Sequence, residues 1–176
     1  MTELERAKEL FLKYNGNRFY MDHDGEGYKY ESYHVSKETE EGWAKEFIDD
    51  FLNTKLYGKE AIRAYITATE LLKSDRKNDD WEKCLYYPLR ADHLDDVTIL
   101  YMLPISFRMA EKAMKKNSFS PQEAASYREE LDAYSRKVLD RAAKGTLTRA
   151  TDYVMQEFSD PAYVEKYLDE LRQKWK

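Results

Sequence analysis

The sequence predicts an all-α fold, an irregular multi-helix bundle or short α-α superhelix of about seven or eight helices. Three observations predict it. Apolar residues recur at helical spacing, helix-start signals lie between these stretches, and strand-like alternation is absent outside residues 15–35. No repeat of fixed length occurs, so a regular repeat array is not expected. Because no Gly/Ser-rich or Pro-rich linker divides the chain, we expect residues 1–176 to form a single helical domain.

The first half of the chain is predicted to contain three helices. An amphipathic stretch ends at Asn15-Gly16, residues that favour the left-handed conformation at a helix end. Ser36 is the expected N-cap of the second helix. Gly58 separates that helix from the third. Residues 15–35 lack helical periodicity, and we predict an irregular or hairpin-like segment there.

The middle of the chain is predicted to contain a short helix and then the longest one. Ser74–Asp80 is polar and predicts a loop. The short helix, Trp81–Tyr87, should end before Pro88, because proline disfavours a helical residue before it. The longest helix should run from about residue 92 to 117. Pro104 should kink it and free the carbonyl of Leu100.

Three further helices are predicted towards the C-terminus. Ser120-Pro121-Gln122-Glu123 combines an N-cap, a proline at the first helical position and a capping-box glutamate. This helix should close at Gly145. A short helix should follow at about Leu147–Phe158, and Asp160-Pro161 should start the last.

The charge and the cysteine content indicate which binding partners and which cellular compartment are expected. The net charge is −5, and residues 22–50 hold ten acids against three lysines, so neither nucleic acid nor an anionic membrane is an expected partner. Cys84 is the single cysteine, and we expect a buried, inert thiol. The N-terminus lacks the apolar core of a signal peptide, and Val97–Phe107 is too short and too interrupted to span a membrane. These features predict a cytoplasmic protein.

Two groups of acidic residues are candidate metal sites, and each also has a simpler structural interpretation. Asp22, Asp24 and Glu26, with Gly27 at the sixth position, match half of an EF-hand calcium loop, which would make this a calcium-stabilised helical protein. However, Tyr33 stands where the bidentate glutamate belongs. The alternative is a glycine-rich turn. The second candidate is a Mg²⁺ site for a hydrolase of the all-α nucleotide pyrophosphatase kind, with these ligands: Glu46, Asp49, Asp92 and Asp95. The alternative is that these acids cap helices.

A third pattern, Glu31-x-x-His34, has the spacing of di-iron ligands, but an exposed pair is the expected state. The sequence shows no complete catalytic set, so we assign no catalytic residue and no cofactor.

The chain has 15 tyrosines, and an aromatic, acidic segment at residues 19–43 is the expected binding face. Tyr28, Tyr30 and Tyr33 cannot all point inward from one helix or strand, and Trp43 follows on the next helix. Exposed tyrosines often mark interfaces. The alternative is that these rings cover the open end of the bundle. We therefore expect a non-enzymatic module that binds an unidentified protein.

The N-terminal quarter carries the stretch AKELFLKYNGNRFYMDHDGEGYKYESYHVSKETEEGWAKE. It resembles the N-terminal part of small, uncharacterised helical proteins from the cytoplasm of Gram-positive bacteria. The resemblance implies a bacterial cytosolic protein of unknown activity and assigns no catalytic residues.

Overall fold

The computed structural model describes residues 1–72, 78–150 and 157–173, and within them it contains nine α-helices, one 3₁₀ helix and no strand. The predicted all-α class is confirmed. The elements are α1 Glu3–Lys13, α2 Arg18–His23, α3 Gly27–Glu31, α4 Lys37–Asn53, α5 Gly58–Leu71, α6 Asp79–Arg90, α7 Asp96–Lys115, α8 Pro121–Ala143, η1 Glu157–Ser159 and α9 Pro161–Gln173.

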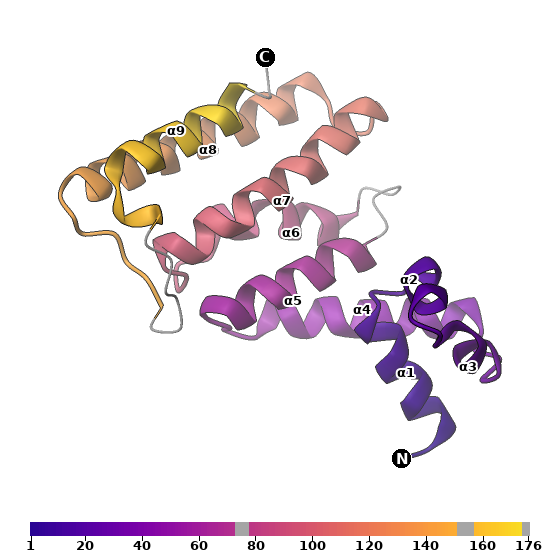
Figure 1. Cartoon of the computed structure of the whole chain (residues 1–176). Helices are drawn as coiled ribbons and strands as arrows, with labels where there is room; N and C mark the ends of the chain where they lie inside the picture. The colour runs from indigo at the N-terminus through magenta and orange to yellow at the C-terminus, as the bar shows by residue number, and fades with distance from the viewer. Residues whose placement is uncertain (73–77, 151–156, 174–176) are drawn as a thin grey trace.

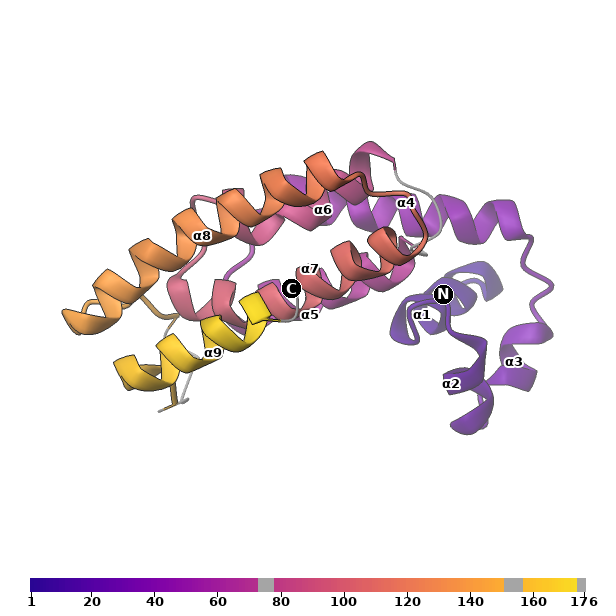
Figure 2. The same ribbon diagram turned by 90° about the horizontal axis from the view of Figure 1, so that it is seen from above.

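The helices form a body and a smaller N-terminal lobe (Figure 1). We call α4–α9 the body and α1–α3 the lobe. In the body, α7 packs against both α5 and α6, and α8 packs against α9. The lobe lies beside α4, which it contacts mainly through α1. Seen from above, α9 and the lobe lie towards opposite ends of the molecule (Figure 2). The arrangement leaves α2 and α3 projecting from the body.

Local signals set several helix boundaries as predicted. The Ser36 hydroxyl accepts a hydrogen bond from the Thr39 amide at 3.2 Å, and Ser120 forms a complete capping box with Glu123. α1 ends at Lys13, just before the left-handed pair Asn15-Gly16, where Gly16 has φ +66° and a Cβ would lie 2.8 Å from the Phe11 ring. These ends depend on interactions within a few residues, which is why sequence alone locates them.

Residues 15–35 differ from the prediction, because they form two short helices and no hairpin. α2 and α3 have six and five residues, too few for a 3.6-residue period to stand out. Gly25, at φ +75°, makes the turn between them. The chain reversal that suggested a hairpin therefore joins the two short helices α2 and α3.

The predicted end of the short helix before Pro88 is wrong, because α6 continues to Arg90. A proline at position i offers no N–H to the carbonyl of residue i−4. Pro88 therefore frees the carbonyl of Cys84. This carbonyl accepts a hydrogen bond from the Tyr65 hydroxyl at 3.0 Å, so the helix passes through the proline with its buried oxygen satisfied.

Pro104 is accommodated in the same way within α7. The carbonyl of Leu100 is freed, as predicted, and it accepts a hydrogen bond from the Tyr167 hydroxyl at 2.8 Å. Tyr167 belongs to α9, so this bond also joins α9 to α7. Both prolines are thus compensated by a tyrosine from another helix.

Tyr65→Phe should lower the free energy of unfolding by about 1–3 kcal/mol, because the Cys84 carbonyl would stay buried without a partner. Urea unfolding measures the change. Tyr57→Phe is the control, since Tyr57 is 56% exposed and should change stability by less than about 0.5 kcal/mol. Equal effects of the two variants would show that the hydroxyl of Tyr65 does not stabilise α6.

The C-terminal half departs from the prediction at three places. α7 begins at Asp96 and not near residue 92, and α8, with 23 residues, is longer than α7, with 20. Residues 147–150 are not helical, and the rest of the predicted helix lies largely outside the described residues. The predicted start of the last helix at Asp160-Pro161 is confirmed.

Cys84 lies in the core, as expected, with no exposed surface. Burial raises the pKa of its thiol to about 12. The reactive thiolate is therefore disfavoured at neutral pH, which agrees with an inert structural cysteine.

Candidate functional site

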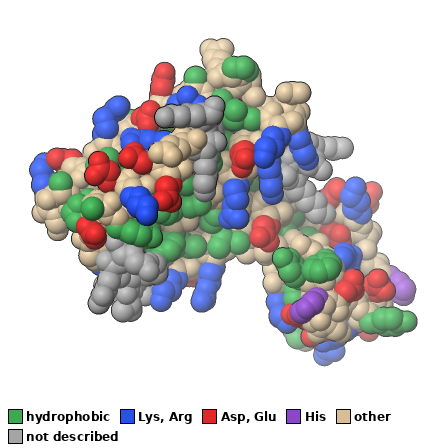
Figure 3. All heavy atoms as spheres, turned by 45° about the horizontal axis from the view of Figure 1, so that its top comes forward, with side chains coloured by type: hydrophobic (Ala, Val, Ile, Leu, Met, Phe, Trp, Pro, Cys, Tyr) green, Lys and Arg blue, Asp and Glu red, His purple; other side chains and the backbone are tan. Residues whose placement is uncertain are grey.

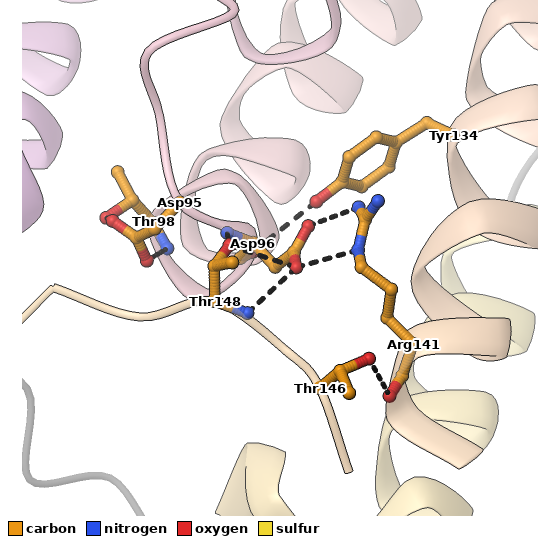
Figure 4. A network of polar contacts seen from close by, with 7 residues as sticks. All are labelled: Asp95, Asp96, Thr98, Tyr134, Arg141, Thr146 and Thr148. Carbon is orange, nitrogen blue, oxygen red and sulfur yellow. Dashed lines mark hydrogen bonds and ion pairs between the residues drawn. The ribbon is translucent and has the colours of Figure 1, made fainter. Parts of the chain in front are cut away.

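The most connected polar group among the described residues is the Asp96 carboxylate, which is only 3% exposed (Figure 4). Arg141 of α8 donates to it from both Nε, at 2.9 Å, and a terminal nitrogen. Thr148 donates from its backbone amide at 3.0 Å and its hydroxyl at 3.1 Å. The carboxylate is thus paired with a cation and held by hydrogen bonds from two separate segments.

Backbone contacts complete this cluster. The Val97 amide donates to the carbonyl of Thr148 at 3.3 Å, and the Tyr134 hydroxyl lies 3.4 Å from the Asp96 carbonyl. Burial, together with the nearby Asp96 charge, raises the pKa of Tyr134. We call Asp96, Arg141 and Thr148 the clasp, because they join the start of α7, the end of α8 and the chain that follows. Its polar groups bind each other, so its role is structural.

The half EF-hand has local partners for its acids. Asp24 accepts a hydrogen bond from the Tyr14 hydroxyl at 3.1 Å, and contacts with His23 and Tyr14 lower the pKa of its carboxyl. Glu26 pairs with Lys29 at 3.4 Å. A Cβ on Gly27 would clash with the carboxylate of Asp22, so a larger residue there would force the exposed Asp22 side chain to move.

Two of the four predicted Mg²⁺ ligands belong to ion pairs on α4. Glu46 pairs with Lys8 of α1 at 2.7 Å, which ties the lobe to the body. Asp49 pairs with Lys45 one turn earlier on the same helix. Both contacts are exposed, and both provide a structural role for these carboxylates.

The other two predicted ligands lie at the start of α7. Asp95 is its N-cap and accepts from the Thr98 amide at 2.9 Å, as the helix-capping alternative predicted, while the Asp92 side chain is exposed. Glu31 and His34 are exposed at the end of α3. Across residues 1–72, 78–150 and 157–173, no three His, Cys, Asp or Glu side chains are placed to hold a metal ion.

The structure separates the aromatic residues that were expected on one binding face. Tyr30 is 1% exposed, its hydroxyl donates to Glu40 at 2.8 Å, and the Arg18 guanidinium lies 4.0 Å from its ring centroid. Burial and the Glu40 carboxylate raise the pKa of Tyr30. Trp43 is buried against Phe11. These two residues belong to the core, which contradicts their expected place on a binding face.

Tyr33 is partly buried against the core, and Tyr28 is 89% exposed. Two neighbours that the sequence did not single out are also exposed, Phe19 at 70% and Tyr20 at 55%. Their rings are in edge contact, with centroids 5.6 Å apart. We call Phe19, Tyr20 and Tyr28 the lobe aromatics.

Acidic residues lie close in sequence to the lobe aromatics. Asp22 on α2, Asp24 in the turn that follows it and Glu31 on α3 are all exposed. The space-filling view shows hydrophobic, acidic and histidine side chains together on the projecting lobe, at the lower right (Figure 3). No sequence signal identified Phe19, because its exposure follows from the six-residue α2 having a single buried position, which only the structure shows.

No protein-family model, curated protein or solved structure matches the chain. No helix in the described part of the chain has the length and apolarity needed to cross a lipid bilayer. The function is therefore inferred from the geometry of the lobe and of the surfaces beside it.

Proposed function

We propose that this chain is a non-enzymatic helical interaction module of a bacterial cytosol and binds another protein through the lobe aromatics. The observation that carries the proposal is the exposure of three large rings on two short helices, Phe19 at 70%, Tyr20 at 55% and Tyr28 at 89%. Removing such rings from water on binding gives a large apolar contribution. Interface hot spots are enriched in tyrosine for this reason.

The lobe provides a supported base for these rings. Met21, on α2, is fully buried, and Tyr30, on α3, is held by Glu40 of α4. The two short helices are therefore anchored on their inner sides while the lobe aromatics face outward. A preorganised surface loses less conformational entropy on binding than a loop that must become ordered.

The charges around the rings specify the chemistry of the partner. Residues 17–35 contain four acids against Arg18 and Lys29. Arg18 already pairs with Glu40 at 2.5 Å, and Lys29 with Glu26. The exposed acids that remain favour a partner surface that combines aliphatic or aromatic side chains with lysine or arginine.

Phe19→Ser and Tyr28→Ser should each weaken partner binding strongly, by about 2 kcal/mol where the ring is a hot spot, which is roughly 30-fold in Kd. Stability should change by less than about 0.5 kcal/mol, since both rings are on the surface. The partner is first captured from a native lysate with the wild-type chain, and its Kd for each variant is then measured with purified components.

Tyr57→Ser is the matched control, because Tyr57 is 56% exposed but lies on the body. Its Kd should equal that of the wild type within about twofold. If Phe19→Ser and Tyr28→Ser bind every captured protein as tightly as the wild type does, the lobe aromatics are not the binding surface and the proposal fails.

A further inference from the structure

We propose that the cleft between the lobe and the body binds a small anionic ligand, one that carries a phosphate or carboxylate beside an apolar ring or chain. The cleft has a volume of about 420 Å³ and is lined by residues of α2, α5, α7 and the turn after α1. Pockets for small ligands usually have volumes of about 300–1,000 Å³. This site shares Tyr20 with the lobe aromatics, but its other lining residues lie outside the interaction surface proposed above.

Two cations of α7 provide the charge for an anion. Arg108 and Lys112 are one helical turn apart, both are exposed, and both line the cleft. Within the described part of the chain, neither forms an ion pair or a side-chain hydrogen bond. Arg90, Arg141 and Arg172, in contrast, each bind a carboxylate.

The dipole of α7 accounts for the position of Lys112 but not for that of Arg108. Lys112 lies in the last turn of α7, where a cation is favoured by the negative end of the helix. Arg108 lies a full turn earlier and gains little from it. Like charges four residues apart on a helix repel each other, and an anion bound between them would relieve that repulsion. The planar arginine fork is suited to phosphate or carboxylate oxygens.

The remaining walls complete an amphiphilic site. The exposed amide of Asn17 and the half-exposed ring of Tyr20 border the cleft on the lobe side, and Ile66, 36% exposed, borders it on the body side. Glu70 is the one acid in the lining, and it accepts a hydrogen bond from Asn15 at 2.5 Å across the cleft. An anion with an apolar part therefore matches both the cations and the walls.

The space-filling view shows Lys and Arg side chains on the right-hand part of the body, above the lobe (Figure 3). Elsewhere the chain carries an excess of acid, with a net charge of −5. The cleft lining itself carries Arg108 and Lys112 against Glu70, and such a local excess of positive charge raises the local concentration of anions and so favours their binding.

Titration of the whole chain with phenyl phosphate, benzoate, inorganic phosphate and phenol tests the proposal, with backbone amide NMR shifts as the readout. We expect saturable shifts at Asn17, Tyr20 and Arg108 with phenyl phosphate or benzoate, and weaker binding of inorganic phosphate and phenol. The stronger of the first two probes identifies the headgroup as phosphate or carboxylate.

The double variant Arg108→Gln/Lys112→Gln should raise the Kd of the stronger probe roughly 10- to 100-fold, because charge-assisted hydrogen bonds are lost. Arg136→Gln/Lys137→Gln removes two exposed cations of α8 outside the cleft and should leave the Kd within about twofold. Absence of saturable shifts at the cleft overturns the proposal, as does an equal loss in both double variants or equally tight binding of phenol. Tyr20 is unchanged in both, so the result is independent of partner binding by the lobe.

Discussion

Asp96→Ala should lower the free energy of unfolding by about 3–5 kcal/mol, the cost of breaking a buried ion pair from one side. Asp96 is 3% exposed and the Arg141 side chain is 35% exposed, so the variant would leave a partly buried guanidinium without its carboxylate. It would also leave the amide and hydroxyl of Thr148 without their acceptor. Urea unfolding followed by circular dichroism measures the change.

Asp132→Ala is the matched control for the clasp. Asp132 pairs with Arg172 at 3.0 Å, but its side chain is 39% exposed, so the loss should stay within about 1 kcal/mol. The double variant Asp96→Ala/Arg141→Ala should be less destabilised than the sum of the two single variants, because no unpaired charge remains. A loss below about 1 kcal/mol for Asp96→Ala would show that the clasp does not hold α7, α8 and residues 146–150 together.

Tyr30→Ala should cost about 3–5 kcal/mol, as expected for removing a buried aromatic side chain, while Tyr28→Ala should cost less than about 0.5 kcal/mol. The two residues are two positions apart on α3, but Tyr30 is 1% exposed and Tyr28 is 89% exposed. Chemical denaturation measures both losses. Amide hydrogen exchange should show the faster opening in α1–α3, because α3, which carries Tyr30, contacts both α1 and α2.

Tyr30→Phe separates packing from hydrogen bonding at this position. It keeps the ring against Arg18 and loses only the bond to Glu40, so a cost of about 1.5–3 kcal/mol is expected for a bond to a charged acceptor. If Tyr28→Ala were as destabilising as Tyr30→Ala, Tyr28 would be a structural residue and not part of a binding surface.

The sequence predicts those helix starts that depend on interactions between residues of a single turn. The starts of α4, α8 and α9 depend on Ser36, Ser120 and Asp160-Pro161, and each acts within its own first turn. The candidate site was less predictable. Residues 19–43 were expected to form a binding face, but the large exposed rings of the lobe are Phe19, Tyr20 and Tyr28. Which rings are exposed depends on which side of each short helix meets the lobe core.

The sequence by itself determined the all-α class, the helix ends that are capped locally and the burial of Cys84, because periodicity and capping are readable within a few residues. Only the tertiary structure decided whether Pro88 ends its helix, since the hydroxyl that satisfies the freed carbonyl belongs to Tyr65 on another helix. It likewise decided the pairing of Asp96 with Arg141, 45 residues away. Contacts of this kind form when helices pack, and no local pattern encodes them.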